Sequence, residues 1–203
     1  SGFTKGTYPL SEVMQVSGNA VLYFFNDGED VPYSYNGNDG NVWEKSAITL
    51  KPVMGVSWLD RLWVFEKNSS ILAYSKTLYP ENFTDSTDAG EVQVGISKKE
   101  IITGLIRYQD TLFILTDRRM YNIEGRTPST FQLREVHSSL GCNSKLSLIN
   151  LEDSFVFLGS DNELYKSGGY QSNTINITQE LKFADMINPN KAHLVVCGYH
   201  KHF

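Results

Sequence analysis

The chain has 203 residues, of which 40% are hydrophobic, 12% aromatic and 20% charged, enough for one sizeable core. Its 18 basic and 23 acidic residues give a net charge of −5 with no basic stripe, which argues against a general nucleic-acid binder. No apolar run approaches the ~18–20 residues that span a bilayer, and the first residues lack the apolar core of a signal peptide. We therefore expect a soluble globular protein.

In chain order, five short runs are apolar on both faces of a strand, and we expect each to be a buried strand. They are VLYF (21–24), LWVF (62–65), LFIL (112–115), FVFL (155–158) and LVVC (194–197). Their first residues lie 41, 50, 43 and 39 positions apart, and the longest interval contains a turn-rich insertion at 78–90. This spacing indicates a structural repeat of about 43 residues.

The runs are also framed alike. Three follow a polar turn that carries an acid, Asp60, Asp110 or Asp153, and before each turn lies another apolar segment. Four are followed by a turn and then by a shorter strand that contains a tyrosine: Tyr33, Tyr74, Tyr121 and Tyr165. The framing predicts an inner strand, a hairpin, a buried strand, a second hairpin and a half-exposed strand in each repeat.

This pattern predicts an all-β protein, a β-propeller of about five antiparallel blades that forms a single domain over residues 1–203. Blade cores are expected near 20–36, 54–75, 102–123, 146–166 and 192–203. A β-sandwich is the alternative. Because few residues follow the fifth run, either residues 6–16 supply the missing outer strand and close the ring, or the chain belongs to a larger propeller. The best helix candidate is 178–187, which ends before Pro189.

Several segments resemble the β-propeller domain of tailed-phage virion structural proteins, of the tail tube, nozzle or hub type found in short-tailed and related phages. The segment DRLWVFEKNSSILAYSKTLYPENF is similar to a buried R-L-W/F strand, an outer strand ending in Y-S and a D/Y-P-x-x-F turn. LFILTDRRMYNIEG resembles the family's L-T-D blade, although Asn162 stands where a later hairpin usually has glycine. The matching segments are 60–83, 112–125, 137–169 and 175–181.

The resemblance implies a non-enzymatic virion structural protein that takes part in assembly around the DNA exit path. It implies a location in the phage tail after a soluble stage in the host cytoplasm, and other virion or tail proteins as partners. A homo-oligomer in the particle is expected, with no sequence-specific nucleic acid, no membrane and no cofactor. An acidic or neutral wall suits a DNA conduit, because basic patches would hold phosphates, although ordinary proteins are mildly acidic too.

An alternative function is a carbohydrate-binding or glycoside-hydrolysing five-bladed propeller. Asp60, Asp110 and Asp153 would then supply the paired carboxylates of a glycosidase, although tight turns explain repeated Asp more simply. The 25 aromatic residues could stack on sugar rings, yet most lie in the buried runs. Trp43 and the pair Trp58 and Trp63 do not share one framing position, which disfavours a lectin.

Metal and nucleotide chemistry have weak support. Cys142 and Cys197 fit no short metal motif and are interpreted as buried thiols rather than a disulfide. The histidines of HLVVCGYHKHF offer at most two convergent zinc ligands, His200 and His202. The oxygen-rich loops at 26–30, 36–41 and 85–88 lack a complete calcium pattern. Walker A and dinucleotide-binding motifs are absent from the sequence.

The insertion at 78–90 is the candidate interaction loop. It carries Leu78, Tyr79 and Phe83 in an otherwise polar, acidic segment, and long loops often have a function. We expect these three residues, with a strand edge at 201–203, to contribute to a protein–protein contact. The alternative is that Phe83 folds back onto its own blade.

Overall fold

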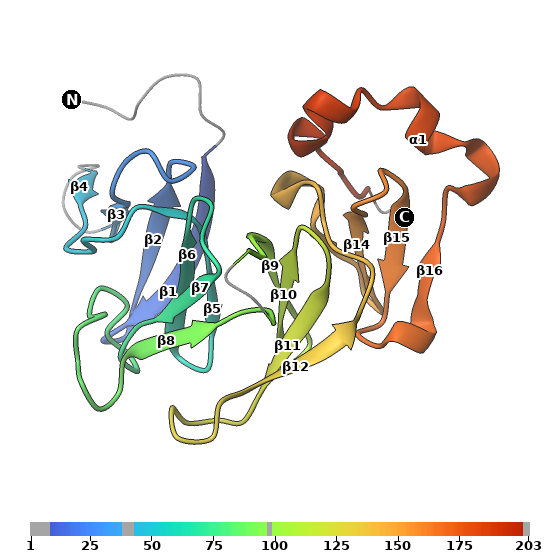
Figure 1. Ribbon diagram of the computed structural model, residues 1–203. Coiled ribbons are helices and arrows are strands. Elements are labelled where there is room, and N and C mark those ends of the chain that lie inside the picture. The colour runs from blue at the N-terminus through green and yellow to red at the C-terminus, as the bar shows by residue number, and fades with distance from the viewer. Residues whose placement is uncertain (1–8, 38–42, 97–98, 201–203) are drawn as a thin grey trace. The chain divides into compact units, whose positions relative to one another are not determined.

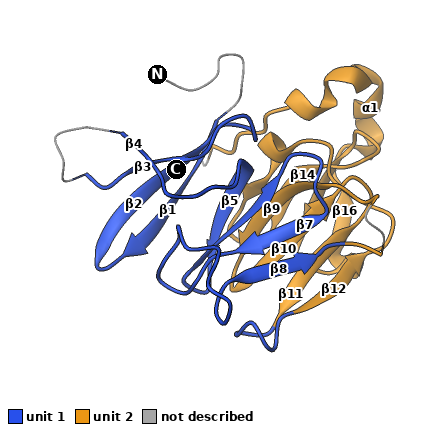
Figure 2. Ribbon diagram, turned by 60° about the vertical axis from the view of Figure 1, so that its left-hand side comes forward, with its two compact units in different colours: residues 1–94, 125–131 blue, residues 95–124, 132–203 orange. Residues whose placement is uncertain are grey.

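The computed structural model describes residues 9–37, 43–96 and 99–200. Within those residues the chain forms sixteen strands in four antiparallel sheets of four strands each, and its helices are short (Figure 1). Contacts divide the chain into two compact units, unit 1 with residues 1–94 and 125–131, and unit 2 with residues 95–124 and 132–203 (Figure 2). Each unit contains two sheets.

Unit 1 holds two sheets whose strands follow one another in chain order, so every connection within a sheet joins neighbouring antiparallel strands. The first sheet consists of β1 (Leu10–Val16), β2 (Asn19–Phe25), β3 (Tyr33–Tyr35) and β4 (Glu44–Lys45). The second consists of β5 (Pro52–Trp58), β6 (Arg61–Glu66), β7 (Ile71–Tyr74) and β8 (Gly90–Gln93). Their facing side chains share one core cluster that includes Tyr23, Phe25, Leu62 and Val64.

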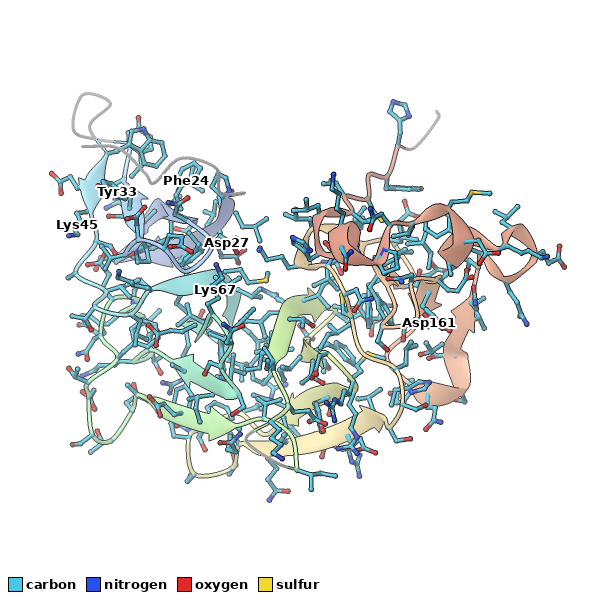
Figure 3. The ribbon with its side chains drawn as sticks, turned by 45° about the horizontal axis from the view of Figure 1, so that its top comes forward. Phe24, Asp27, Tyr33, Lys45, Lys67 and Asp161 are labelled. Atoms are coloured by element: carbon cyan, nitrogen blue, oxygen red, sulfur yellow. The ribbon has the colours of Figure 1, made fainter. Side chains whose placement is uncertain are left out.

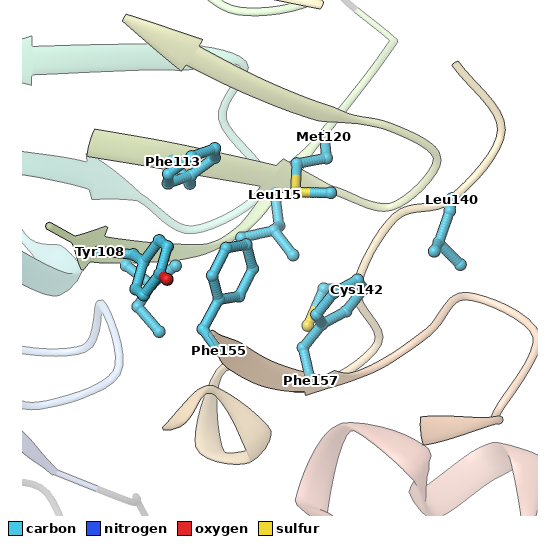
Figure 4. Close-up of a cluster of buried hydrophobic side chains, with 9 residues drawn as sticks. Tyr108, Phe113, Leu115, Met120, Leu140, Cys142, Phe155 and Phe157 are labelled. Atoms are coloured by element: carbon cyan, nitrogen blue, oxygen red, sulfur yellow. The ribbon is translucent and has the colours of Figure 1, made fainter. Parts of the chain in front are cut away.

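Unit 2 repeats this order. Its sheets are β9 (Ile102–Tyr108), β10 (Thr111–Thr116), β11 (Met120–Glu124) and β12 (Gln132–His137), then β13 (Ile149–Asn150), β14 (Phe155–Leu158), β15 (Leu164–Ser167) and β16 (Thr174–Asn176). Phe113 and Leu115 of β10 pack with Phe155 and Phe157 of β14 in its core (Figure 4). The short helices are η1 (Lys145–Ser147), η2 (Gln171–Asn173), η3 (Gln179–Leu181), α1 (Phe183–Met186) and η4 (Pro189–Leu194).

The predicted order of an inner strand, an apolar run and a tyrosine-bearing strand is confirmed in the three sheets that contain the second, third and fourth runs, whereas the first run is not a fully buried strand, since Val21, Leu22 and Phe24 are only half-buried. The first four apolar runs lie in β2, β6, β10 and β14, which is the second strand of each sheet. The four tyrosines lie in β3, β7, β11 and β15, which is always the third strand. Tyr74 and Tyr121 are buried although their strands were expected to be half-exposed: Tyr74 packs against Trp63 and Phe131, and the Tyr121 hydroxyl donates to Glu100.

The fifth run is the main error of the sequence prediction. Leu194 ends the 3-10 helix η4, and residues 195–197 form no strand, so the described chain has four sheets rather than about five blades. The run lacks the preceding hairpin of the other four, and a four-residue apolar run alone does not distinguish strand from helix. The strand edge predicted at 201–203, like part of the loop at 36–41, lies outside the described residues.

Two further expectations are corrected. Residues 10–16 form β1 and pair with β2, because the two-residue turn at Ser17 and Gly18, both with positive φ, makes a local hairpin. They are therefore not the outer strand of a last blade, and residues 6–8 lie outside the described part. The helix expected at 178–187 is split into η3 and α1 by Lys182, which adopts a left-handed conformation. Among the described residues, no helix has the length and apolarity needed to cross a bilayer.

Candidate functional site

The candidate interaction loop predicted at 78–90 lies, except for Gly90 at the start of β8, in the connection between β7 and β8; this whole connection, residues 75–89 of unit 1, is called the loop below. Two of its three predicted contact residues point into solvent: Leu78 is 52% exposed and Tyr79 is 58% exposed. Phe83 is partly buried against the core cluster of unit 1, as the alternative prediction had it. The loop therefore offers Leu78 and Tyr79 to a partner, while Phe83 holds the loop to its own unit.

A buried arginine anchors the end of the loop. Arg61, the first residue of β6, is 3% exposed, and its guanidinium donates hydrogen bonds to the carboxylate and the carbonyl oxygen of Asp88. It also donates to the Ser75 carbonyl at 2.8 Å and lies over the rings of Tyr74 and Phe131. A cation that is removed from water needs such hydrogen-bond partners. Arg61 therefore connects Ser75, at the start of the loop, to Asp88, near its end.

Asp88 has a second role at the same place. Its carboxylate accepts hydrogen bonds from the Thr77 backbone N–H at 3.0 Å and from the Thr77 hydroxyl at 3.3 Å. Burial raises the pKa of Asp88, but the hydrogen bonds from Arg61 and Thr77 outweigh it, so the pKa is lower than usual. Asp88 is therefore an ionised group that joins the beginning of the loop to its end.

Asp85 organises the middle of the loop. Its carboxylate accepts from the Lys76 ammonium at 2.9 Å, from the Thr87 hydroxyl at 2.8 Å and from the Asp88 backbone N–H at 3.0 Å. The hydrogen bond from Lys76, followed by those from Thr87, lowers the pKa of Asp85 well below its usual range. The Lys76 ammonium also lies 5.4 Å from the ring centroid of the exposed Tyr79. Both carboxylates of this segment thus have cationic partners, which disfavours the calcium interpretation of residues 85–88.

Further bonds fix the loop to the rest of unit 1. The Asn82 side chain accepts from the backbone N–H groups of Thr84 and Asp85, both at 3.1 Å, which forms a tight turn. Glu81 accepts from the Ala47 N–H at 3.0 Å. Burial, with Glu81 as the next cause, raises the pKa of Tyr23. The loop is thus a preorganised structure held by side chains rather than a free coil.

Leu78 lies at a strained point of this structure. Its φ is +63°, in the left-handed region that leucine rarely adopts, and its N–H donates to the Asp60 carbonyl at 2.8 Å. An exposed leucine held in this conformation has no evident role in the core, and strained residues often occur at functional sites. With ordered apolar side chains and paired charges, the loop can bind a surface. It offers no activated nucleophile.

The three aspartates considered for glycosidase chemistry occupy equivalent hairpins. Asp60, Asp110 and Asp153 lie between the first and second strands of three different sheets. Asp60 adopts a left-handed φ of +56° in its two-residue turn. Asp153 accepts from the Ser154 hydroxyl at 2.9 Å and pairs with Lys166 at 3.2 Å. For Asp60 and Asp153, the turn geometry accounts for the residue without catalysis.

The candidate metal residues do not gather in the described part of the chain, where no group of three or more His, Cys, Asp or Glu is placed to hold an ion. Cys142 is buried and Cys197 partly buried, and both are free thiols. Burial raises the pKa of Cys142 to about 12, so this thiol is protonated at neutral pH. His202 lies outside the described residues.

Sequence reasoning missed the residues that hold the loop. The burial of Arg61 could be predicted, because an arginine directly before a fully apolar strand must either be buried with that strand or disrupt its packing. Asp88 and Phe131 have none, because they come from distant irregular segments. The sequence also undervalued Trp43, which is 44% exposed and packs on Phe24 at 4.5 Å and Tyr35 at 4.9 Å between ring centroids.

Comparison with known proteins adds little to this description. No family model matches the chain, and no curated protein matches it. Among solved structures, the chain is similar to the extracellular domain described as part of a one-component system of B. thetaiotaomicron, with 12% identity and a TM-score of 0.38. The match covers 81% of this chain and 27% of that chain, so this chain spans about a quarter of the matched protein's length.

Proposed function

We propose that the protein is a non-enzymatic structural component of a tailed-phage virion, of the tail, nozzle or hub type, that takes part in assembly around the DNA exit path. The support is the sequence resemblance together with its position in the fold. The resembling segments at 60–83, 112–125 and 137–169 include β6, β7, β10, β11, β14 and β15, the central strands of three sheets. Net charge −5 suits a surface that lets DNA pass rather than holds it.

We further propose that the four sheets are blades of one β-propeller over residues 1–203. Each sheet is a four-stranded antiparallel meander in chain order, with its apolar run in the second strand and its tyrosine in the third. Repetition of one such unit is typical of propellers. A sandwich offers no reason for this identical framing.

The observation that carries the partner proposal is the preorganised loop at 75–89. It holds Leu78 and Tyr79 in solvent with their backbone already fixed, so little conformational entropy remains to be lost on binding. The expected partners are other virion or tail proteins, including further copies of this chain. Neither a membrane nor a specific nucleic-acid sequence is expected as a partner.

The test replaces Leu78 and Tyr79 together by Ser in a phage genome that encodes this chain, and measures the protein in purified particles by mass spectrometry. The parent protein is expected in every particle, and the double variant is expected to fold but to be depleted. The matched control is Ile96→Ser, because Ile96 is 78% exposed and lies outside the loop. Absence of the parent protein from particles overturns the function, whereas normal incorporation of the double variant overturns only the loop's role.

A second candidate is the carbohydrate-binding or glycoside-hydrolysing propeller, now with four sheets instead of five blades. The exposed ring of Trp43 on Phe24 and Tyr35 favours it, since such rings stack on sugars. A glycan array with the parent and with Trp43→Ala tests binding. Assays on aryl glycosides with Asp60, Asp110 and Asp153 each changed to Asn test hydrolysis, and activity lost in any of the three places this function first.

A further inference from the structure

Unit 1 contains an open cavity on the core-facing side of the sheet β5–β8, next to the last strand of that sheet. Its volume is about 150 Å³, and its floor is apolar because Val64 of β6 and Ala73 of β7 are buried there. Ile71 and Leu50, both half-buried, complete the apolar lining. The strand register aligns Val64 with Ala73 and Ala73 with Glu91 of β8, so these side chains share one face. The cavity therefore crosses β6, β7 and β8.

Two carboxylates flank this apolar floor. Glu66 is the last residue of β6 and Glu91 is the second residue of β8, so they stand on opposite sides of β7. Both residues are exposed. Glu66 accepts a hydrogen bond from the Lys51 backbone N–H at 2.8 Å, and among the described residues neither carboxylate forms an ion pair. The cavity is thus an apolar surface between two negative charges.

The lysine that follows Glu66 in the sequence does not neutralise this charge. The Lys67 ammonium donates to the Glu29 carboxylate at 2.8 Å and also lies near Asp27, in the region that Figure 3 labels. The Lys51 side chain forms no ion pair with any residue that the structure describes. A cation with an aliphatic stem is therefore the group that complements the cavity, since the stem covers apolar surface and the charge meets the carboxylates.

The volume limits which cation fits. A water-sized atom takes about 30 Å³, so the cavity holds about five non-hydrogen atoms. A lysine side chain matches this size with its four-carbon stem and one nitrogen, whereas the planar guanidinium makes arginine larger. The methylene groups of a lysine would lie over Ala73 and Ile71, with the ammonium between Glu66 and Glu91. Size and charge together select lysine.

The neighbouring edge of the sheet indicates how such a lysine is presented. In the described part of the chain β8 pairs with β7 alone. The Val94 N–H donates to the Ser70 carbonyl at 2.8 Å, and hydrogen-bonded pairs alternate along an antiparallel ladder. By this alternation the aligned pair of Ala73 and Glu91 is not hydrogen-bonded, so the backbone N–H and C=O groups of Glu91 point away from β7. A strand added at this edge would place the side chain opposite Glu91 on the face of the cavity.

We propose that the cavity binds the side chain of a lysine in an extended segment of a partner protein, which adds as a further strand beside β8. The backbone of the segment pairs with the outward groups of Glu91, and its lysine extends over Ala73 toward the carboxylate of Glu66. Backbone pairing supplies affinity, and the cavity selects the residue at one position. This inference goes beyond the proposed function and does not depend on it, since the contact uses unit 1 alone and requires no particular particle.

The test titrates the whole chain into a fluorescently labelled peptide and measures anisotropy. The peptide is short, capped at both ends, and alternates threonine with valine around a central lysine, so that it favours an extended conformation. Matched peptides carry arginine or norleucine at the centre. The lysine peptide is expected to bind about tenfold more tightly than the norleucine peptide, and more tightly than the arginine peptide, because only lysine combines the charge with the right size.

Variants of the protein separate the effect of charge from that of shape. Glu66→Gln and Glu91→Gln are each expected to weaken binding of the lysine peptide about threefold. Glu44→Gln is the matched control, because Glu44 is exposed on β4, the last strand of the other sheet of unit 1, and should leave the affinity unchanged. Ala73→Leu fills the cavity without changing a charge and should abolish the preference for lysine. Circular dichroism checks each fold, and Ala73→Val is used if Ala73→Leu unfolds.

The proposal is wrong if the lysine peptide does not bind at any attainable concentration, if the norleucine peptide binds equally well, or if both glutamine variants bind like the parent. Equal binding of the arginine peptide, or an unchanged preference for lysine in Ala73→Leu, means attraction to surface charge rather than a fitted cavity and also contradicts it. n-Butylammonium, which has the same stem and charge but no backbone, serves as a competitor. If it binds as tightly as the peptide, the ligand is a free amine rather than a protein segment, which overturns the proposed partner.

Discussion

Each unit of the molecule buries one half of an ion pair, but the two units bury opposite charges. In unit 1 the Arg61 side chain is 4% exposed and its partner Asp88 is 30% exposed. In unit 2 the carboxylate is the buried member: Glu100 is 5% exposed and Arg119 is 27% exposed. The buried member decides what a substitution costs, because it loses its solvation and depends on its partners.

The two pairs also do different work in the fold. Arg61 joins β6 to the loop at 75–89, so its partners hold an irregular segment in place. Glu100 receives hydrogen bonds from Arg119 at 2.9 Å and from the Tyr121 hydroxyl at 2.7 Å, which lie around strand β11. Burial, and then the bond to Glu100, raises the pKa of Tyr121 to about 12. The ion pair of unit 1 therefore fixes a loop, whereas the ion pair of unit 2 lies at a strand.

The strongest test of this comparison is Arg61→Ala. Removing the buried cation takes one donor from the Asp88 carboxylate, which keeps only its bonds from Thr77, and one from the Ser75 carbonyl, and we expect a loss of about 3–5 kcal/mol in the free energy of unfolding. Arg61→Met keeps much of the packing under Tyr74 and Phe131 and should cost less. Urea denaturation measures both variants. A cost below about 1 kcal/mol for Arg61→Ala would mean that the loop does not depend on Arg61.

The corresponding test in unit 2 is Gly95→Ala. Gly95 has a φ of +86°, and a Cβ there would lie 2.0 Å from a carboxylate oxygen of Glu100. We expect a loss of about 2–3 kcal/mol, the sum of left-handed strain and displacement of the carboxylate. Gly18→Ala is the matched control, because Gly18 has a similar φ of +84° and nothing within 4 Å of the added atom. Equal costs at both glycines would show that crowding of Glu100 contributes nothing.

These pairs mark the limit of what the sequence could predict. Hairpins and buried strands follow from local patterns, so the second and third strands of all four sheets could be predicted from runs such as residues 62–65 and 112–115, whereas β1 was assigned to a last blade and the fourth strands, such as β4, contain no such run. The partner of Arg61 could not, because Asp88 follows 27 residues later in a segment without periodicity. The prediction for residues 194–197 was wrong for the opposite reason: their local pattern suits a strand, but in the described part of the chain they follow the short helix η4 and pair with no strand.

Acid should affect unit 1 through its loop, and the effect is expected to be smaller than that of either substitution. The folded state lowers the pKa of Asp85 and Asp88, so the stability they contribute is present above the ordinary aspartate pKa and is lost as pH falls below it. The urea concentration at the midpoint of denaturation should therefore decrease as the pH is lowered from about 5 to about 2. All three tryptophans lie within residues 1–94, so tryptophan emission reports unit 1.

The control for the acid experiment is Asp88→Asn, which is less stable at neutral pH but should show a shallower decline in acid. An unchanged midpoint of the parent at about pH 2 would contradict the role of these carboxylates. Asp153 of unit 2 has a lowered pKa as well, owing first to its hydrogen bond from Ser154 and then to Lys166, but it belongs to the unit that tryptophan emission does not report.

The smallest expected effect is also the one that connects stability to function. Leu78 holds a φ of +63°, which costs a leucine roughly 1–2 kcal/mol and an asparagine less. Since Leu78 is 52% exposed, Leu78→Asn loses little burial and should stabilise unit 1 by about 0.5 kcal/mol. Leu78→Ala is the control, because it removes the same side chain but keeps the strain, and it should give no gain. If urea denaturation shows Leu78→Asn to be no more stable than Leu78→Ala, the left-handed conformation at this position does not destabilise the fold. If it is more stable and also fails to enter particles, the leucine is retained for contact with a partner at a cost to the fold.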